Sequence, residues 1–336
     1  MTDQLFLALE APGHGTHPHE LRALATEAEQ AGFTLVTFAD SPVPSSPAAS
    51  SIEAGTRAAF VSTTTNRIGL APELHVTTTE PFHLATQLAS LDHASNGRGA
   101  WVIGAANGTT NLATIGASPL DAKSWHREIT DVIDVVRDLW DSWQDDAVIR
   151  DVTTGRYLDP SRVHHVDFQG ARFSVKGPLI TPRPPQGQLV VIAPEHLDVA
   201  DRAEVVLVKG TDGPALGARA TAARTAGAAL VFAEVTAGFH ESEADAPKRP
   251  EAGRLHHQGS AAALVDLLSS LTDTVDGVRL HPADAQRDTP ILLETVAPAL
   301  ARAGRLRAPT PGATVRSTLG LPRPTNRFAA AATTAA

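Results

Sequence analysis

The chain contains no cysteine among its 336 residues. This excludes disulfide bonds, thiolate catalysis and cysteine-ligated zinc, and it makes the reducing cytoplasm the expected compartment. Phe, Trp and Tyr together make up only 4% of the chain, too little for an aromatic platform on which nucleic-acid bases stack. No apolar run approaches the roughly 20 residues that a membrane helix needs. We therefore expect neither a membrane span nor a base-stacking surface.

Positive charge is also scarce. Lys and Arg number 28 against 37 Asp and Glu, which gives a net charge of -9. A nucleic-acid partner needs clustered basic side chains, and the one basic pair, Lys248-Arg249, stands between acidic residues. The N-terminus MTDQLFLALEAPGHG has no basic segment before its first apolar run, so we expect no signal peptide. The histidines form no H-E-x-x-H motif, and no metal site is expected.

Short apolar runs alternate with amphipathic segments along the chain. Such repeated strand–helix units predict a parallel sheet covered by helices, and eight of them predict closure into a TIM-type (β/α)8 barrel of the α/β class. A Rossmann fold is the alternative, but no G-x-G-x-x-G motif follows the first strand and no phosphate-binding P-loop motif occurs. The expected strands are 5–10, 33–40, 67–74, 97–106, 189–193, 203–208, 229–235 and 275–282.

The helical segments complete the expected domain. Gly32 suits the residue after the first helix, and Pro81 suits the first turn of the third. We expect one barrel domain over residues 1–307, with an irregular insertion at 144–187 between strands four and five and a tail at 308–336. The expected helices are 18–31, 51–63, 82–95, 121–143, 213–226, 259–272 and 289–304.

Three polar residues follow the expected barrel strands, at the end where TIM barrels carry their active sites. His14, in APGHGTH, lies between glycines that permit close approach of a ligand, and its imidazole is a candidate acid–base group. A surface-loop histidine is the alternative. Asp40 ends the second strand and is either a site residue or a cap of the next helix. Thr77, in TTT after the third strand, is either a site hydroxyl or part of a satisfied turn.

Several longer stretches are similar to one enzyme family in their order along the chain. They are FADSP (38–42), TTTEPFHLATQLASLDHASNGRGAW (77–101), VVRDLWDSWQDDAV (135–148), RFSVKGPLITPRPPQGQLVVIA (172–193), VDGVRLHP (275–282) and STLGLPRPTNRF (317–328). Together they resemble the luciferase-like flavin monooxygenases, in the branch of nitrilotriacetate monooxygenase, dibenzothiophene-sulfone monooxygenase and the pristinamycin synthase large subunit.

The resemblance implies a barrel that takes reduced FMN from a separate flavin reductase and uses O2 to oxygenate a small organic substrate. It also implies a homodimer, and an insertion near the barrel mouth that can act as a lid and exclude water. Deazaflavin-dependent oxidoreductases share the barrel, which leaves deazaflavin as the alternative cofactor.

The resemblance also suggests site residues. Asp40 and Thr77 match positions that contact flavin in the family. His126, at the start of a long helix, takes the place of a tyrosine that contacts the FMN phosphate. Trp101 either borders the flavin or substrate or belongs to the core. His196 lies in APEHLD, where the family has A-G-S-S facing the phosphate, and is a candidate cofactor contact.

Some positions depart from the family's pattern. Val102 and Ala106 replace polar residues, Ala122 replaces a histidine, and Glu195 brings a negative charge to the phosphate loop. These departures leave open a second interpretation, in which the chain is a non-catalytic barrel that serves a partner chain.

Overall fold

The computed structural model describes residues 3–13, 17–43, 52–239 and 253–329. Within them, eight parallel strands close into a barrel in the order β1-β2-β3-β4-β9-β10-β11-β13, and β13 pairs with β1. This confirms the predicted TIM-type (β/α)8 fold, with each predicted strand present. The strands are β1 (Phe6–Ala11), β2 (Leu35–Phe38), β3 (Gly69–His75), β4 (Ala100–Gly104), β9 (Val190–Pro194), β10 (Val205–Val208), β11 (Leu230–Gly238) and β13 (Gly277–Pro282).

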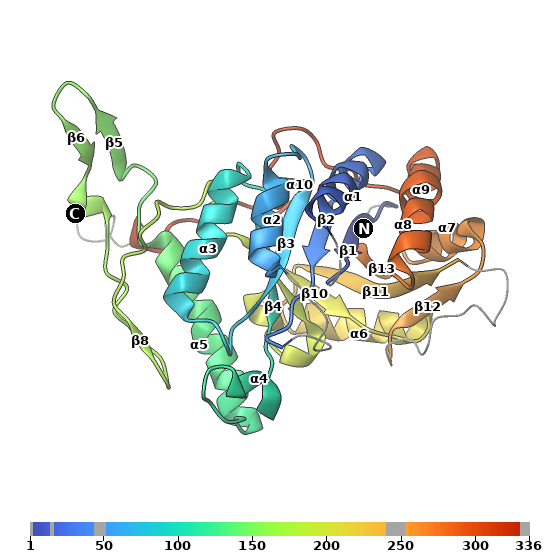
Figure 1. Cartoon of the computed structure of the whole chain (residues 1–336), viewed down its shortest axis with the longest axis horizontal. Coiled ribbons are helices and arrows are strands. Elements are labelled where there is room, and N and C mark those ends of the chain that lie inside the picture. Colours follow the sequence, from blue (N-terminus) through green and yellow to red (C-terminus); the bar gives the residue numbers. More distant parts are fainter. Residues whose placement is uncertain (1–2, 14–16, 44–51, 240–252, 330–336) are drawn as a thin grey trace.

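Helices surround the barrel on its outside (Figure 1). The seven predicted helices are present, and the last begins earlier than expected as a continuous run of α8, the π-helical turn η5 and α9. Two short helices, α4 and α10, are additional to the predicted set. The helices are α1 (Pro18–Ala31), α2 (Ala54–Ser62), α3 (Pro81–Ala94), α4 (Thr109–Ala113), α5 (Ala122–Asp141), α6 (Gly213–Thr225), α7 (Ala261–Ser270), α8 (Ala285–Ile291), η5 (Leu292–Val296), α9 (Ala297–Arg302) and α10 (Val315–Thr318).

Local sequence signals set several helix ends. Gly32 follows α1 with a left-handed backbone (φ 90°), and its N–H bonds to carbonyls of the last turn, as its position predicts. Pro81 is the first residue of α3, where its missing N–H costs nothing, and Glu80 caps the exposed N–H groups of that turn. Such signals need only neighbouring residues, which is why the sequence alone predicts them.

Alternate residues of each strand point into the barrel or out toward the helices. The inward residues nearest the strand N-termini form an apolar plug, and α10 with the residue after it adds two more apolar side chains at that end. Because this plug is apolar and buried, we expect a ligand to enter from the opposite end, at the strand C-termini. The plug includes Phe6, Ala8, Leu35, Ala71, Ala100, Val102, Val190, Ile192, Val205, Leu207, Phe232, Val315 and Leu319.

The insertion carries two hairpins, β5 (Val148–Asp151) with β6 (Arg156–Leu158) and β7 (Phe168–Gln169) with β8 (Ser174–Val175), separated by the short helix η1 (Pro160–Arg162). Figure 1 shows the β5–β6 hairpin projecting away from the barrel beyond α3 and α5.

The insertion is fastened to α5. Ala171 N donates to Asp131 of α5 at 2.7 Å, and the indole N–H of Trp143, just after α5, donates to the carbonyl of Leu179 at 2.8 Å. Arg183 pairs with Asp141, the last residue of α5, at 2.8 Å. These contacts place the insertion along α5, beside the barrel, and the lid that the resemblance implied stays a prediction.

Three further elements lie outside the predicted set. The strand β12 (Leu255–Gln258) pairs with β11 beside the barrel, between the predicted strand 229–235 and the predicted helix 259–272, where residues 240–252 lie outside the described residues. The short turns η2 (Glu195–Leu197) and η3 (Ala200–Arg202) lead from β9 to β10. No helix among the described residues has both the length and the apolar composition to cross a membrane.

Candidate functional site

Charged side chains fill the upper layer of the barrel interior, at the C-terminal ends of the strands. Glu10 of β1, Glu73 of β3, Glu234 of β11 and Arg279 of β13 alternate with outward-facing apolar neighbours on their strands. Burying a charge in the interior of a barrel costs free energy unless the charge is paired. Buried charged groups are therefore often found at functional sites.

Glu234 and Arg279 form the centre of this layer. Arg279 Nη2 lies 2.7 Å from Glu234 Oε1, and the imidazole of His281 contacts the other carboxylate oxygen. Arg254 lies 3.7 Å from the same carboxylate, and Arg279 also reaches Glu10 at 3.4 Å. Burial alone raises the pKa of Glu234, but Arg279 and His281 outweigh it, so the pKa lies well below the ordinary value. The mouth therefore has a fixed, ionised floor.

A pocket of about 250 Å³ opens beside this floor, at the C-terminal ends of β2 and β3 and the start of α2. It combines carboxyl, hydroxyl and imidazole groups at the end of the barrel where ligands bind in this fold. The lining residues are Asp40, Ser41, Pro42, Glu53, Glu73, Leu74, His75, Thr78 and Thr79.

Two of the carboxylates in the pocket hold the beginning of α2. Asp40 accepts hydrogen bonds from Ala54 N at 2.6 Å and from Ser41 N at 2.8 Å. Glu53 is the N-cap of α2 and accepts from Gly55 N and Thr56 N. Asp40 therefore acts as a cap, and its side chain also lies in the wall of the pocket.

Arg57 of α2 ties the ends of two barrel strands together. Its guanidinium donates to the carbonyl of Pro12, after β1, at 2.8 Å, and to the carbonyl of Ala39, after β2. Burial lowers the pKa of Arg57, while the nearby Asp40, Glu10 and Glu53 act to raise it. The ends of β1 and β2 are thus held to α2 directly below the pocket.

Glu73 and His75 lie two residues apart on β3 and face the same side. His75 Nε2 lies 3.6 Å from Glu73 Oε1 and 3.4 Å from the carbonyl of Asp40. The ring packs against Gly104 of β4, where a Cβ atom would lie 2.7 Å from His75 Nδ1. Glycine at position 104 is therefore what admits the imidazole. Burial lowers the pKa of His75, so the ring is neutral at pH 7.

Thr77 lies in the turn after β3, next to the pocket residue Thr78. Its hydroxyl donates a 2.6 Å hydrogen bond to the carbonyl of Ala106, after β4. The hydroxyl therefore links the two strand ends. It leaves an oxygen lone pair available, although the hydroxyl proton is already used.

Trp101 belongs to the outer core. It is fully buried on β4 in the layer between strands and helices, and its indole N–H donates to the carbonyl of Leu74 at 3.2 Å. Its neighbour Val102 faces the barrel interior instead. The structure thus places Trp101 away from the mouth, in the position of its core alternative, because adjacent strand residues face opposite sides.

The candidate histidines His126 and His196 lie on different elements. His126 lies in the second turn of α5 and is partly exposed. His196 lies in η2 and is exposed, near the ends of β9 and β10. His14 falls outside the described residues. No described cluster of His, Asp or Glu side chains has the arrangement of a metal site.

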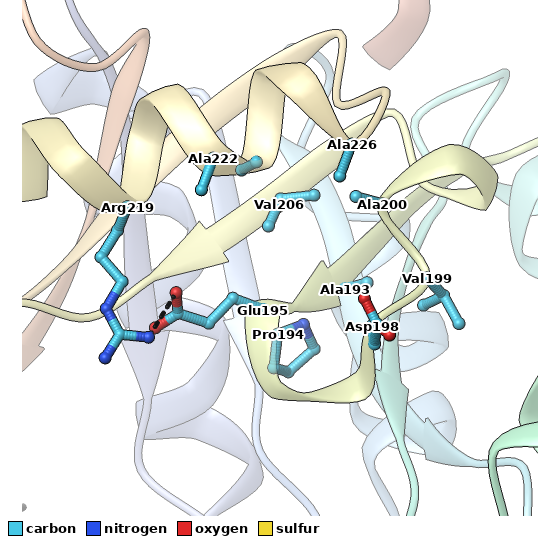
Figure 2. A pocket seen from close by; sticks show the side chains of 11 residues that line it. Ala193, Pro194, Glu195, Asp198, Val199, Ala200, Val206, Arg219, Ala222 and Ala226 are labelled. Atoms are coloured by element: carbon cyan, nitrogen blue, oxygen red, sulfur yellow. Dashed lines mark hydrogen bonds and ion pairs between the residues drawn. The ribbon is translucent and has the colours of Figure 1, made fainter. Parts of the chain in front are cut away.

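A second pocket, of about 200 Å³, lies between η2, β10 and α6 (Figure 2). Arg219 of α6 reaches down to Glu195, with Nη1 3.2 Å from Oε2, and Lys209 N donates to Oε1 at 3.0 Å. The Glu195 carboxylate is thus held toward α6 by two donors, which explains how the loop after β9 tolerates its charge. Alanines of β9 and α6 and two valines form the apolar remainder of the pocket.

Sequence reasoning missed Glu73, Glu234, Arg279 and His281. The available signal was a charged residue within an apolar strand run, as in GLAPELH and VDGVRLHP. A single charge of this kind is ambiguous in sequence, because the same pattern occurs on exposed strands.

Comparison with known proteins identifies similar sequences among monooxygenases. N-acetyl-S-(2-succino)cysteine monooxygenase of Bacillus subtilis (strain 168) is 36% identical over 176 residues, which cover 51% of this chain and 40% of that protein. Dibenzothiophene-sulfone monooxygenase of Rhodococcus erythropolis is 31% identical over 142 residues, which cover 42% of this chain and 31% of that protein. The chain thus matches less than half the length of each of these relatives.

The solved structure of a long-chain alkane monooxygenase superposes with a TM-score of 0.85 at 19% identity, over 98% of this chain and all of that one. At this identity the likeness establishes the fold alone. The family profile described as luciferase-like monooxygenase matches residues 5–246, well over half of the chain. This confirms the resemblance inferred from the sequence: the chain belongs to the luciferase-like monooxygenase family.

Proposed function

We propose that this chain is the oxygenating component of a two-component monooxygenase, which takes reduced FMN from a separate flavin reductase and uses O2 to oxygenate a small organic molecule. The observation that carries the proposal is the pocket at the ends of β2 and β3, where Asp40, Glu73 and His75 meet beside an ionised barrel floor. Family membership supports the reaction type, and the pocket supplies polar groups at the end of the barrel where family members act.

The polar groups of the pocket fit a flavin ring. Flavin presents alternating N–H and carbonyl groups along one edge, and the Glu73 carboxyl lacks a donor from the described residues. Asp40 and Glu53 hold α2 at the pocket wall, and Thr77 holds the turn after β3. When bound, reduced FMN would supply the electrons that activate O2. The residues of this chain would orient the ring and the substrate and limit access of water.

At the end of the proposed FMN site that would hold the phosphate, this chain offers fewer polar side chains than the family's sequence pattern does. His126 is the side chain we assign to the phosphate, because it is partly exposed near the start of α5. His196 is a second candidate, on the exposed side of η2. Glu195 does not oppose a phosphate there, since Lys209 N and Arg219 hold its carboxylate toward α6. A site with few phosphate contacts suits a flavin that arrives and leaves with each turnover.

The partners follow from this proposal. In this proposal the electrons come from a separate flavin reductase. The predicted homodimer and the cytoplasmic location stay predictions of the sequence. The substrate is a small organic molecule, admitted at the strand C-termini because the other end of the barrel is packed.

The deciding experiment is a titration of the purified chain with FMN, first oxidised and then anaerobically reduced, followed by flavin fluorescence and calorimetry. We expect micromolar binding that is tighter for the reduced form. A parallel titration with deazaflavin tests the alternative cofactor. Binding of deazaflavin alone would replace FMN in the proposal, and binding of neither would favour the non-catalytic barrel suggested by Val102 and Ala106.

A further inference from the structure

The carboxyl group of Glu73 differs from the other carboxyl groups around the barrel mouth. Among the described residues, no N–H or O–H group donates a hydrogen bond to it, and His75 Nε2 lies 3.6 Å from Oε1. Its side chain is one-quarter exposed, and that exposed part lines the 250 Å³ pocket. Burial and neighbouring charges can therefore change the protonation of this carboxyl, while its exposed part can contact a ligand.

The other acidic groups at the mouth are all occupied. Asp40 accepts two backbone hydrogen bonds, and Glu53 caps α2. Glu10 accepts from the Thr37 hydroxyl and pairs with Arg279. Glu234 is paired with Arg279 and His281. An ionised carboxylate without donors is the costly member of such a set, so Glu73 is the one that gains from holding a proton.

The charged groups that face Glu73 also favour its protonated form. Burial is the largest cause that raises the pKa of Glu73, to about 8, and Glu10 of β1 adds to it. Asp40, after β2, and Glu234 of β11 raise it further, while Arg279 of β13 acts in the opposite direction. On β3 itself the neighbour is the neutral ring of His75. Glu73 is therefore largely protonated at pH 7.

The tautomer of His75 is set by its two neighbours. Nδ1 lies 3.4 Å from the backbone N–H of Ala106 and accepts from it, so the proton of the neutral ring is on Nε2. This N–H points to the Asp40 carbonyl and toward Glu73. It is a donor for a carboxylate at Glu73, not a base that would remove its proton.

We propose that Glu73 acts in its protonated form as the acid of this site, giving its proton to an anionic oxygen of the molecule bound in the pocket, with His75 as the positioning residue. This rests on the proposed function, which supplies reduced FMN and O2 as the source of that oxygen. The O–H bond of the Glu73 carboxyl breaks and an O–H bond forms on the bound molecule. The step is a proton transfer, without oxidation or reduction. The carboxylate that remains is stabilised by His75 Nε2–H and Arg279, and it regains its proton from water at the pocket opening.

The first test needs no flavin. Carbon-13 labelling of glutamate side chains lets each carboxyl be titrated by NMR, and Glu73→Gln identifies the resonance of Glu73 by its loss. We expect a midpoint near pH 8. A midpoint near the ordinary glutamate value of 4.5 would overturn the proposal, whatever the protein does with flavin.

The second test follows the reaction of bound, reduced FMN with O2 by the flavin absorbance, between about pH 6 and about pH 10. We expect the wild-type rate to fall about tenfold per pH unit above its midpoint, and Glu73→Gln to be slow throughout with no midpoint. Glu27→Gln, the same change on the exposed face of α1, is the matched control and keeps the wild-type profile.

His75→Gln separates the two residues. It keeps a side-chain amide donor near Glu73, so we expect a shifted midpoint with a rate loss smaller than that of Glu73→Gln. If FMN binds and the pH profile of Glu73→Gln matches wild type, the acid role falls while the monooxygenase proposal stands. If the chain binds no flavin, the monooxygenase proposal falls and the acid role falls with it.

Discussion

Arg279 and Glu234 face each other across neighbouring strands inside the barrel, with Nη2 2.7 Å from Oε1 and both side chains nearly inaccessible to solvent. The pair forms on β13 and β11, which are in parallel register with Glu234 opposite Arg279. Because each charge is buried, each depends on the other for its solvation. The pair gives the barrel mouth a rigid, ionised floor on which the pocket between β2 and β3 is built.

Removing one member of this pair should destabilise the protein strongly. In Arg279→Met, the partners of Glu234 that remain among the described residues are His281 and Arg254, so we expect a loss of about 2–4 kcal/mol of unfolding free energy. The double variant Glu234→Gln/Arg279→Met should recover part of that loss, since no unpaired carboxylate remains. Urea denaturation measures both. Equal stability of Arg279→Met and wild type would show that the pair is not buried as described.

The titration of Glu73 should appear in the stability of the protein. Its pKa is about 8 in the folded chain against an ordinary 4.5, so between these values the unfolded chain has released a proton that the folded chain retains. Unfolding free energy therefore falls as pH rises through this window and levels off above about pH 8.

Glu73→Gln removes this dependence. We expect the variant to gain stability relative to wild type as pH rises from about 5 to about 8, by about 3–4 kcal/mol in total. Denaturation midpoints at a series of pH values measure the difference. Glu27→Gln, exposed on α1, should track wild type at every pH, and parallel curves for Glu73→Gln and wild type would contradict the raised pKa.

The sequence predicts features that neighbouring residues determine, and it misses features that depend on residues far apart along the chain. Gly32 and Pro81 act on their own turns, and the apolar strand runs need only their own composition, so the barrel was predicted correctly. Glu10 and Arg279 meet only after β13, the last barrel strand, has closed against β1. For Trp101 the sequence leaves both a flavin contact and a core position open, because the strand register is not known from sequence, and a one-residue change of register turns a side chain from the barrel interior to the outer core.

Asp40 should affect flavin binding and the start of α2 together. Asp40→Leu leaves Ala54 N and Ser41 N without their acceptor, so we expect a loss of about 1–2 kcal/mol of stability and at least about a tenfold loss in FMN affinity. Asp40→Asn keeps an acceptor oxygen of the same shape and should lose less of both. FMN titration and thermal unfolding report the two effects. Undiminished binding by Asp40→Leu would remove Asp40 from the flavin site.

His126 should distinguish FMN from riboflavin. If its imidazole contacts the phosphate, FMN should bind about tenfold more tightly than riboflavin, and His126→Ala should abolish that preference without changing riboflavin affinity. His196→Ala, made in parallel, tests the second candidate at the same end of the flavin. Equal affinities of the wild-type chain for the two flavins would exclude a phosphate role for either histidine.

The C-terminal tail should contribute strongly to the stability of the barrel through Arg316. This side chain is buried, with Nη2 2.6 Å from Glu204 Oε1 and Nε 2.6 Å from the carbonyl of Gln188, while its neighbour Val315 joins the apolar plug. We expect Arg316→Ala to lower the unfolding free energy by about 3–5 kcal/mol, because Glu204 loses a buried partner.

Arg323 provides the matched control in the same tail. It pairs with Asp145 at 2.6 Å, but its side chain is about half exposed, so solvent screens the pair and Arg323→Ala should cost at most about 1 kcal/mol. Urea denaturation of both variants compares a buried with an exposed arginine in one segment. Similar losses of unfolding free energy for the two variants would mean that the tail adds little to the packing of this barrel end, and that the apolar plug is stabilised by the strands alone.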